Sequence, residues 1–200
     1  MNYLYLCLIA SFIFFQNPLV RNELFIDINN DSAKEKIYLR EDFWISGYPK
    51  SYRIIIENNN QKWQSRPFTL DKLFIAPISQ KSQPDFILLL NRFTPKSPQP
   101  KKHVYLYSWR NGKLESVWEG SSFSKPIEDI IIKKSNDGII YLYTLEQIDK
   151  DNYRIVKYNW TGFGFVGEIV ETSSYEKIKQ EFNKLNIDAY PYLLASNHYT

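Results

Sequence analysis

One short segment near the N-terminal end of the chain carries residue types that can hold a hard cation. Its first, third and fifth positions are Asp27, Asn29 and Asp31, and its ninth position is Glu35. The backbone carbonyl of Ala33 is available at the seventh position. Ca²⁺ takes roughly six to eight oxygen ligands, and alternate positions on a tight loop can point their oxygens inward. The spacing therefore predicts one Ca²⁺ ion held by these five residues, which would stiffen this part of the chain.

The segment differs from an EF-hand loop at two positions. Its twelfth position is Tyr38, where an EF-hand needs a bidentate Glu, and its sixth is Ser32, where an EF-hand needs Gly. A second interpretation is that Asn29, Asn30 and Asp31 form a plain Asx-type turn between two strands. The two interpretations differ in whether the protein responds to Ca²⁺.

Residues that commonly carry catalysis are scarce in this chain. There are two His, His103 and His198, and a single Cys, Cys7. His103 follows Lys101 and Lys102, and His198 is close to the C-terminus, so we expect both imidazoles to be solvated. Because Cys7 is the only Cys, the chain can form no internal disulfide and no site with several thiolate ligands. We therefore predict that the chain is not an enzyme.

Two pairs of acidic residues are the remaining candidates for catalysis: Glu128 with Asp129, and Asp149 with Asp151. Glycosidases use two acids roughly 5 to 9.5 Å apart. A carboxylate-dependent, glycan-active enzyme is therefore the less favoured alternative, and we interpret these residues as solvated charges in loops or at strand starts. Three tryptophans are expected to pack in the core rather than to form a platform for a sugar: Trp109, Trp118 and Trp160.

The chain repeats itself with a period of about fifty residues. Three segments align without gaps at a constant offset: residues 51–63, 102–114 and 153–165. Each has the pattern of a strand, a tight turn and a returning strand. A second pair of apolar segments precedes each of these hairpins, so each unit has four predicted strands. The upstream strands are expected at residues 24–27 and 36–39, 73–76 and 86–90, and 130–133 and 139–143.

A repeated four-stranded unit is typical of a β-propeller, whose blades contain about 40 to 50 residues. The units are expected at about residues 22–71, 72–127 and 128–172. Propellers close with roughly four to eight blades, so three units fall short of a ring. We therefore predict a mostly β fold with about three four-stranded antiparallel units in a partial or propeller-like arrangement. An open arc, a pair with a second copy, a β-sandwich and an ordinary antiparallel sheet are the alternatives.

The segment with Asp27, Asn29, Asp31 and Glu35 between two apolar strands resembles the calcium loop of FG-GAP/VCBS-type β-propeller repeats. In that family each blade tends to carry such a loop, with a glycine where this chain has Ser32. The second and third units of this chain lack the ligands. The resemblance implies a propeller-like fold, bound Ca²⁺ and an extracellular recognition role.

Residues 1–20 are expected to form a signal peptide or a membrane anchor. The run Tyr3–Phe15 is almost wholly apolar, and it is shorter than the ~20 residues that a spanning helix needs. No Lys or Arg precedes the run, and no clear small-x-small cleavage site follows it. A buried first strand or helix is the alternative. This leader predicts a protein that is secreted, periplasmic or membrane-anchored.

Residues 173–200 are expected to form a helix and a tail. Ser173 and Glu176 have the spacing of a capping box. Apolar residues then recur on one helical face, at Ile178, Phe182 and Leu185. The pattern predicts a helix of about 13 residues that packs across a sheet edge or across the open end of the arc, where it would protect exposed strands.

The charge of the chain does not indicate a nucleic-acid partner. The formal net charge is +3, because 25 Lys and Arg are spread among 22 Asp and Glu. The leader and the repeats, together with the scarcity of catalytic groups, predict a non-catalytic binding or scaffold domain that recognises a protein or glycan through loops. A structural subunit that oligomerises, or that completes a larger β structure with another chain, is the alternative.

Overall fold

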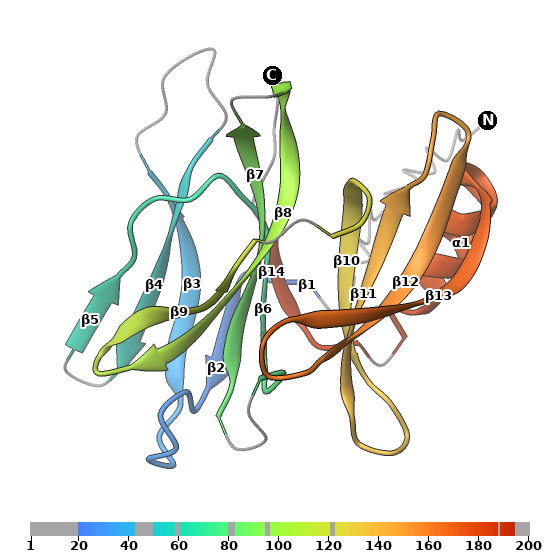
Figure 1. Ribbon diagram of the computed structural model, residues 1–200. Helices are drawn as coiled ribbons and strands as arrows, with labels where there is room; N and C mark the ends of the chain where they lie inside the picture. Colours follow the sequence, from blue (N-terminus) through green and yellow to red (C-terminus); the bar gives the residue numbers. More distant parts are fainter. Residues whose placement is uncertain are drawn as a thin grey trace, which may run out of the picture.

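The computed structural model describes residues 20–42, 50–58, 61–79, 83–94, 97–120, 123–187 and 189–194. The predicted leader lies outside the described residues apart from Val20, and Cys7 and His198 lie outside them as well. The chain is mostly β, with antiparallel sheets and one short C-terminal helix, as the sequence predicts (Figure 1). In the part of the chain that the structure describes, no helix is both long and apolar enough to cross a membrane.

In the described residues, twelve strands follow one another in three runs of four, and within each run consecutive strands pair in antiparallel fashion. The first run is a sheet of its own, whereas the second and third runs belong to one sheet, joined where Lys102 pairs with Ile127. We call these runs the first, second and third units. The first contains β2 (Glu23–Ile26), β3 (Glu35–Glu41), β4 (Tyr52–Asn58) and β5 (Gln61–Gln64). The second contains β6 (Leu70–Ala76), β7 (Asp85–Thr94), β8 (Ser97–Arg110) and β9 (Lys113–Glu119). The third contains β10 (Ile127–Lys134), β11 (Ile140–Gln147), β12 (Asn152–Trp160) and β13 (Phe165–Ser174).

Tight turns close the hairpins where the sequence predicts them. The β8–β9 turn uses Asn111 at φ 51° and Gly112 at φ 73°, and the turn before β13 uses Gly162 at φ 95°. Residues at positive φ give a two-residue turn the twist that matches the flanking strands. The β10–β11 connection is longer, and there Gly138, at φ 86°, ends a β-turn in which its N–H donates to the Ser135 carbonyl. The repeat period therefore marks equivalent turns.

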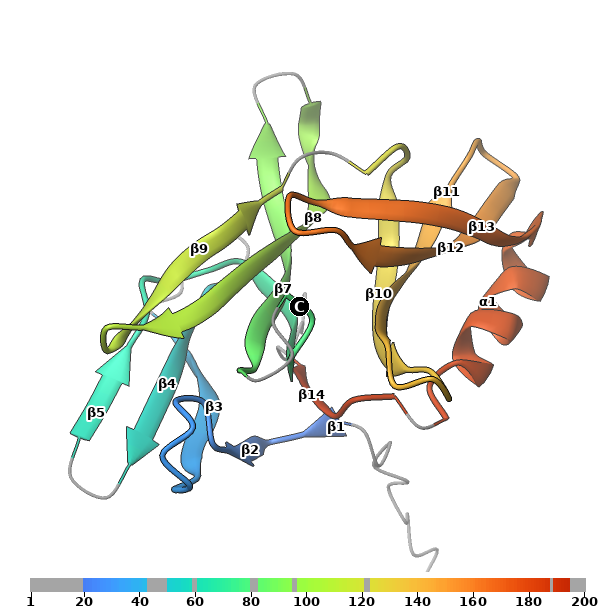
Figure 2. The ribbon, with the colours of Figure 1, turned by 60° about the horizontal axis from the view of Figure 1, so that its bottom comes forward.

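The second unit packs against the first and also against the third, so it lies between the other two (Figures 1 and 2). Successive side chains of a strand point to opposite faces. In β8, Tyr105 and Tyr107 pack in the cluster with the first unit, whereas Val104 and Leu106 pack in the cluster with the third. Each fully buried aliphatic side chain stabilises the fold by roughly 1.5–3 kcal/mol. We call the two layers of packing the first seam and the second seam.

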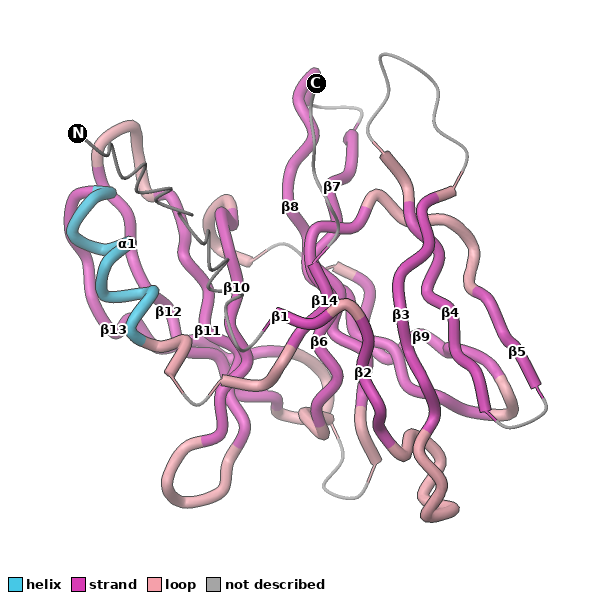
Figure 3. Tube along the Cα trace, turned by 180° about the vertical axis from the view of Figure 1, so that it is seen from behind, coloured by secondary structure: helices cyan, strands magenta, loops and turns pink. Residues whose placement is uncertain are grey.

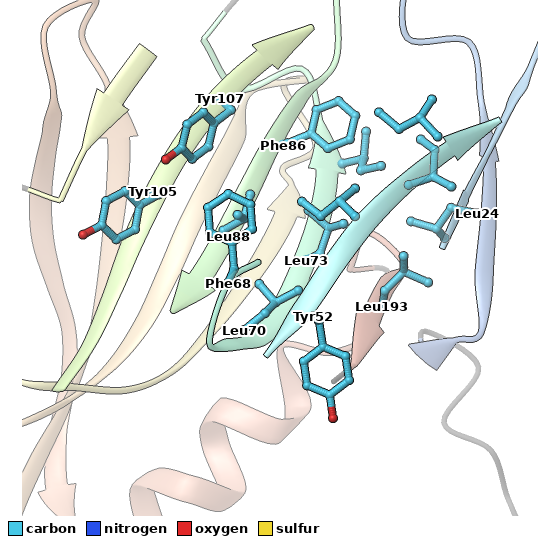
Figure 4. Close-up of a cluster of buried hydrophobic side chains, with 14 of the residues drawn as sticks. Leu24, Tyr52, Phe68, Leu70, Leu73, Phe86, Leu88, Tyr105, Tyr107 and Leu193 are labelled. Atoms are coloured by element: carbon cyan, nitrogen blue, oxygen red, sulfur yellow. The ribbon is translucent and has the colours of Figure 1, made fainter. Parts of the chain in front are cut away.

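The first seam contains large side chains from the first and second units, drawn in Figure 4. The labelled residues are Leu24, Tyr52, Phe68, Leu70, Leu73, Phe86, Leu88, Tyr105, Tyr107 and Leu193. Leu193 comes from β14 (Tyr192–Leu194), which pairs with β6. The cluster therefore joins the C-terminal end of the described chain to the first two units.

The helix α1 (Tyr175–Lys184) covers the outer face of the third unit, at the open end of the stack (Figure 3). Its Ile178 and Phe182 are buried there with Leu145. The predicted capping box is wrong: β13 continues to Ser174, so Ser173 pairs with Tyr153 in the strand ladder. The N-cap is Ser174, which makes no side-chain capping bond. The helix packs on a sheet face and not across an edge.

The C-terminal segment then returns along the strands that begin the units (Figure 2). Tyr190 donates its N–H to the Ile132 carbonyl of β10. β14 pairs with β6 and also with β1 (Val20–Arg21), the latter in parallel. The three units form no closed ring, and in the described chain this segment occupies the side where the edges of β10 and β6 lie.

Candidate functional site

The predicted calcium segment is a compact loop between β2 and β3. The Asp27 carboxylate accepts hydrogen bonds from the backbone N–H of Ser32 at 2.8 Å and of Asp31 at 3.2 Å. Asn30 and Ser32 both adopt positive φ, 61° and 71°. Ser32 thus takes the backbone conformation that Gly supplies in an EF-hand loop. The loop folds back around Asp27.

The polar side chains of this loop form one hydrogen-bonded cluster. The Asn29 amide donates to Asp31 at 3.0 Å and to Glu35 at 3.4 Å. Glu35 is buried and accepts the N–H of Ile28 at 3.0 Å. Asp31 accepts the N–H of Ala33 at 2.8 Å. The structure therefore brings together the four side chains that the spacing selected.

The donor set of the loop only partly fits a metal ion. Among the described residues, no group of three or more His, Cys, Asp and Glu side chains is arranged to hold one. The carboxylates accept N–H groups instead, and the Asn29 amide bridges Asp31 and Glu35. Rotation of that amide would replace its N–H donors by an oxygen ligand. The Ca²⁺ site stays a prediction.

A shallow cleft at the first seam lies beside this loop. It has a volume of about 310 Å³ and is lined in part by Asn29, Glu35, Trp63 and Trp109. The two indole rings meet edge to face, with centroids 5.2 Å apart. The Gln83 amide donates to the carbonyls of Ile28 at 3.2 Å and of Trp109 at 2.6 Å. These bonds fix the loop to the second unit.

A larger cleft lies at the second seam, and we call it the seam cleft. Its volume is about 480 Å³. The β12–β13 hairpin reaches toward β9 here (Figure 2), so both units contribute to the walls. Phe163, in the hairpin turn, is 97% exposed. The lining residues are Trp118, Phe123, Ser124, Arg154, Val156, Tyr158, Phe163, Gly164, Phe165, Gly167 and Ile169.

A buried polar network supports the seam cleft from the third unit. Glu146 is fully buried and accepts two hydrogen bonds from Arg154, at 2.7 and 3.0 Å. It also accepts the hydroxyls of Tyr158 at 2.7 Å and Thr144 at 3.0 Å. Arg154 donates in addition to the Ser124 hydroxyl. Burial and the bond to Glu146 raise the pKa of Tyr158 above its usual value, so the phenol keeps its proton.

Two glycines shape the wall of the seam cleft. A Cβ at Gly167 would lie 2.4 Å from Cε1 of Tyr158, so only glycine lets that ring pack against β13. A Cβ at Gly164 would lie 3.7 Å from Nε1 of Trp118, which is ordinary contact. Gly164 directly precedes β13.

The other predicted residues lie apart from this cleft or play a packing role. His103 was expected to be solvated, but its Nε2 is buried and, in the described part of the chain, has no hydrogen-bond partner. Burial, together with the charges of Arg92 and Lys101, lowers the pKa of His103.

Asp129 lies in β10 and pairs with Lys72 at 2.6 Å. Asp149 accepts the N–H groups of Asp151 and Asn152 within a turn. As expected, three tryptophans pack against the seams: Trp109, Trp118 and Trp160.

Comparisons with known proteins add no assignment, because no family model, curated protein or solved structure matches the chain. The sequence did not single out the seam cleft. Its residues come from four separate stretches of the chain, the first at Trp118 and the last ending at Ile169. One signal was present: Glu146 and Arg154 stand on either side of a turn, and strand pairing places them opposite each other.

Proposed function

We propose that this chain is a non-catalytic recognition domain, exported or membrane-tethered, that binds a protein or glycan in the seam cleft. One observation carries the proposal: Phe163 is 97% exposed at the rim of a cleft whose walls are aromatic. An exposed aromatic ring beside a concave aromatic surface is a common feature of binding sites.

The chemistry of the cleft suits recognition of a ligand with apolar and polar parts. Trp118 and Phe165 present ring faces and edges, their centroids 5.2 Å apart at an interplanar angle of 81°. Ser124 and Arg154 supply hydrogen-bond donors on the same surface. Because Glu146 holds Arg154 in place, the donors are positioned before a ligand arrives.

The fold proposed for this function is an open, propeller-like arc of three blades, similar to FG-GAP/VCBS-type repeats. The packing of the first unit against the second, and of the second against the third, supports it. The loop around Asp27 would be a calcium loop of the first blade. The apolar N-terminal run supports export or tethering.

A pair of matched substitutions tests the recognition role. Phe163→Ser removes the exposed ring at the cleft, and Phe25→Ser removes a ring that is 53% exposed on the first unit. Both variants of the full chain would be screened with the wild type against immobilised glycans and candidate protein ligands. We expect at least one ligand to lose about tenfold or more in affinity with Phe163→Ser, a change of about 1.4 kcal/mol, and to keep its affinity with Phe25→Ser. If no ligand distinguishes the two variants, the seam cleft is not the recognition site.

An assembly role is the second candidate, and the β13 edge favours it. β13 is the last strand of its sheet, and its Val166, Ile169 and Val170 are 63%, 56% and 53% exposed. Such an edge can pair with a strand of another chain. Val170→Lys would then lower the mass that light scattering measures at high concentration. A wild-type protein that stays monomeric there would contradict the assembly role.

A further inference from the structure

A second, basic cleft adjoins the seam cleft. It has a volume of about 280 Å³ and shares the lining residues Phe123 and Ser124 with the seam cleft. We call it the basic cleft. Its lining residues are Lys101, Lys102, His103, Val104, Phe123, Ser124, Lys125, Pro126 and Ile127.

The charge along the two clefts has one sign. Lys101, Lys102, Lys125 and Arg154 line them, and no acidic residue is among the described residues that line either cleft. Two of the four cations form ion pairs with carboxylates that do not line either cleft: Asp71 pairs with Lys102 at 3.0 Å, and Glu146 pairs with Arg154 at 2.7 Å. Lys101 and Lys125 form no ion pair within the described chain.

Other groups near the basic cleft also favour an anion. His103 lines this cleft, and its buried Nε2 has no hydrogen-bond partner among the described residues. On the neighbouring strand, Arg92 lies directly opposite Lys101. Like charges at opposed positions of a ladder repel each other. The Arg92 guanidinium donates to the Tyr105 hydroxyl and lies over that ring, so Arg92 adds positive charge near His103 without lining the cleft.

We propose that the two clefts form one groove that binds an acidic polysaccharide. Sugar rings would stack on the exposed ring of Phe163, and carboxylate or sulfate groups would contact Lys101 and Lys125. The inference rests on the proposed recognition function and names its ligand class.

Charge and shape favour a polysaccharide over two other acidic polymers. An acidic peptide that added as a strand to β13 would run along Glu168 and Glu171, which would repel it. A nucleic acid gains affinity with each phosphate that the protein neutralises. Two unpaired lysines supply few such contacts, whereas the aromatic walls suit sugar rings that carry charge at wider intervals.

The test compares acidic polymers with neutral polymers of the same backbone. Calorimetric titration of the full chain would use polygalacturonate against its fully methyl-esterified form, and dextran sulfate against dextran. Two variants would be compared with the wild type. One is a double variant that combines Lys101→Gln and Lys125→Gln, and the other is Phe163→Ser. Their controls are Lys113→Gln, whose side chain is 61% exposed on β9, and Phe25→Ser.

We expect at least one acidic polymer to bind about tenfold or more tightly than its neutral partner, with most of that advantage lost in the double lysine variant. Phe163→Ser would weaken binding of the same polymer, and the two control variants would bind it as the wild type does.

If neither acidic polymer is preferred, the inference is overturned. If neutral and acidic forms bind equally and Phe163→Ser weakens both, the recognition function stands without the acidic ligand. If a single-stranded oligonucleotide or a poly-glutamate peptide binds as tightly through the same lysines, the groove is a general anion site, which also overturns the inference.

Discussion

The two seams of this protein are built from the same repeat but differ in what they leave open. At the first seam a smaller cleft of about 310 Å³ remains, and Gln83 of the second unit donates one hydrogen bond across the seam to the Ile28 carbonyl. At the second seam a cleft of about 480 Å³ remains beside a buried ion pair. Gly164 and Gly167 bring no side chain to that wall, whereas the chain has Lys113 and Ser116 one period earlier. Both of those side chains are exposed on β9, so they do not fill the first seam.

Breaking the ion pair of the second seam should have the largest effect on stability. Arg154→Ala leaves the fully buried Glu146 without its counter-charge. We expect the free energy of unfolding to fall by about 3–5 kcal/mol, measured by urea denaturation. The control is Arg53→Ala in the first unit, where the pair with Asp42 is about a quarter exposed on both sides. That change should cost about 1 kcal/mol or less. Equal losses for the two variants would show that the second seam does not depend on its ion pair.

The glycines of the second seam should differ from each other. Gly167→Ala forces the Tyr158 ring away and should cost about 1–3 kcal/mol, with the loss read from thermal unfolding. Gly164→Ala fits at 3.7 Å from Trp118 and should cost less than about 0.5 kcal/mol. A harmless Gly167→Ala would mean that Tyr158 is not held against β13.

The loop beside the first seam should respond to Ca²⁺ if its oxygen-rich cluster takes the ion. At a free Ca²⁺ concentration ten times the dissociation constant, binding stabilises the fold by about 1.4 kcal/mol, which would raise the melting temperature. Asp31→Asn keeps the shape of the side chain but removes a charge, so its response should be smaller. No heat of binding and no rise in melting temperature in the wild type would leave a plain Asx-type turn as the correct interpretation.

The smallest expected effect is a pH dependence from His103. Its pKa is lowered in the folded protein, chiefly by burial, so in acidic solution the folded state binds fewer protons at this side chain than the unfolded chain does. Stability should therefore fall as the pH decreases below about 6.5, the ordinary pKa of a histidine in an unfolded chain. In the His103→Gln variant, the midpoint of urea denaturation should change less with pH between about pH 7 and 5.5. This range lies above the ordinary pKa of carboxylates. If the midpoint of the variant depends on pH as steeply as that of the wild type, His103 is solvated in solution.

Much of the fold could be predicted from the sequence because the pattern of each strand is local. Short apolar runs mark the strands, glycines mark three of the turns, at Gly112, Gly138 and Gly162, and Ile178 and Phe182 mark the helix face. The helix start was wrong because strand pairing of Ser173 competes with capping, and only the tertiary structure decides between them. The position of α1 on a sheet face could not be predicted, since it depends on which unit ends the stack.

The candidate site was predictable only where it is continuous in the chain. Asn29, Asp31 and Glu35 are close in the chain, so their spacing was enough to bring them together. The seam cleft depends on Trp118 in one unit meeting Phe165 in the next. Such a contact follows from how units stack, and the pattern within a strand does not contain it.

Hydrogen exchange with and without polygalacturonate compares the two seams in one measurement. The account predicts slower amide exchange on binding in residues 123–127 and 161–169, around the seam cleft, and no change in residues 61–64 and 109–112 at the first seam. Protection confined to the first seam, or none at either seam, would contradict it.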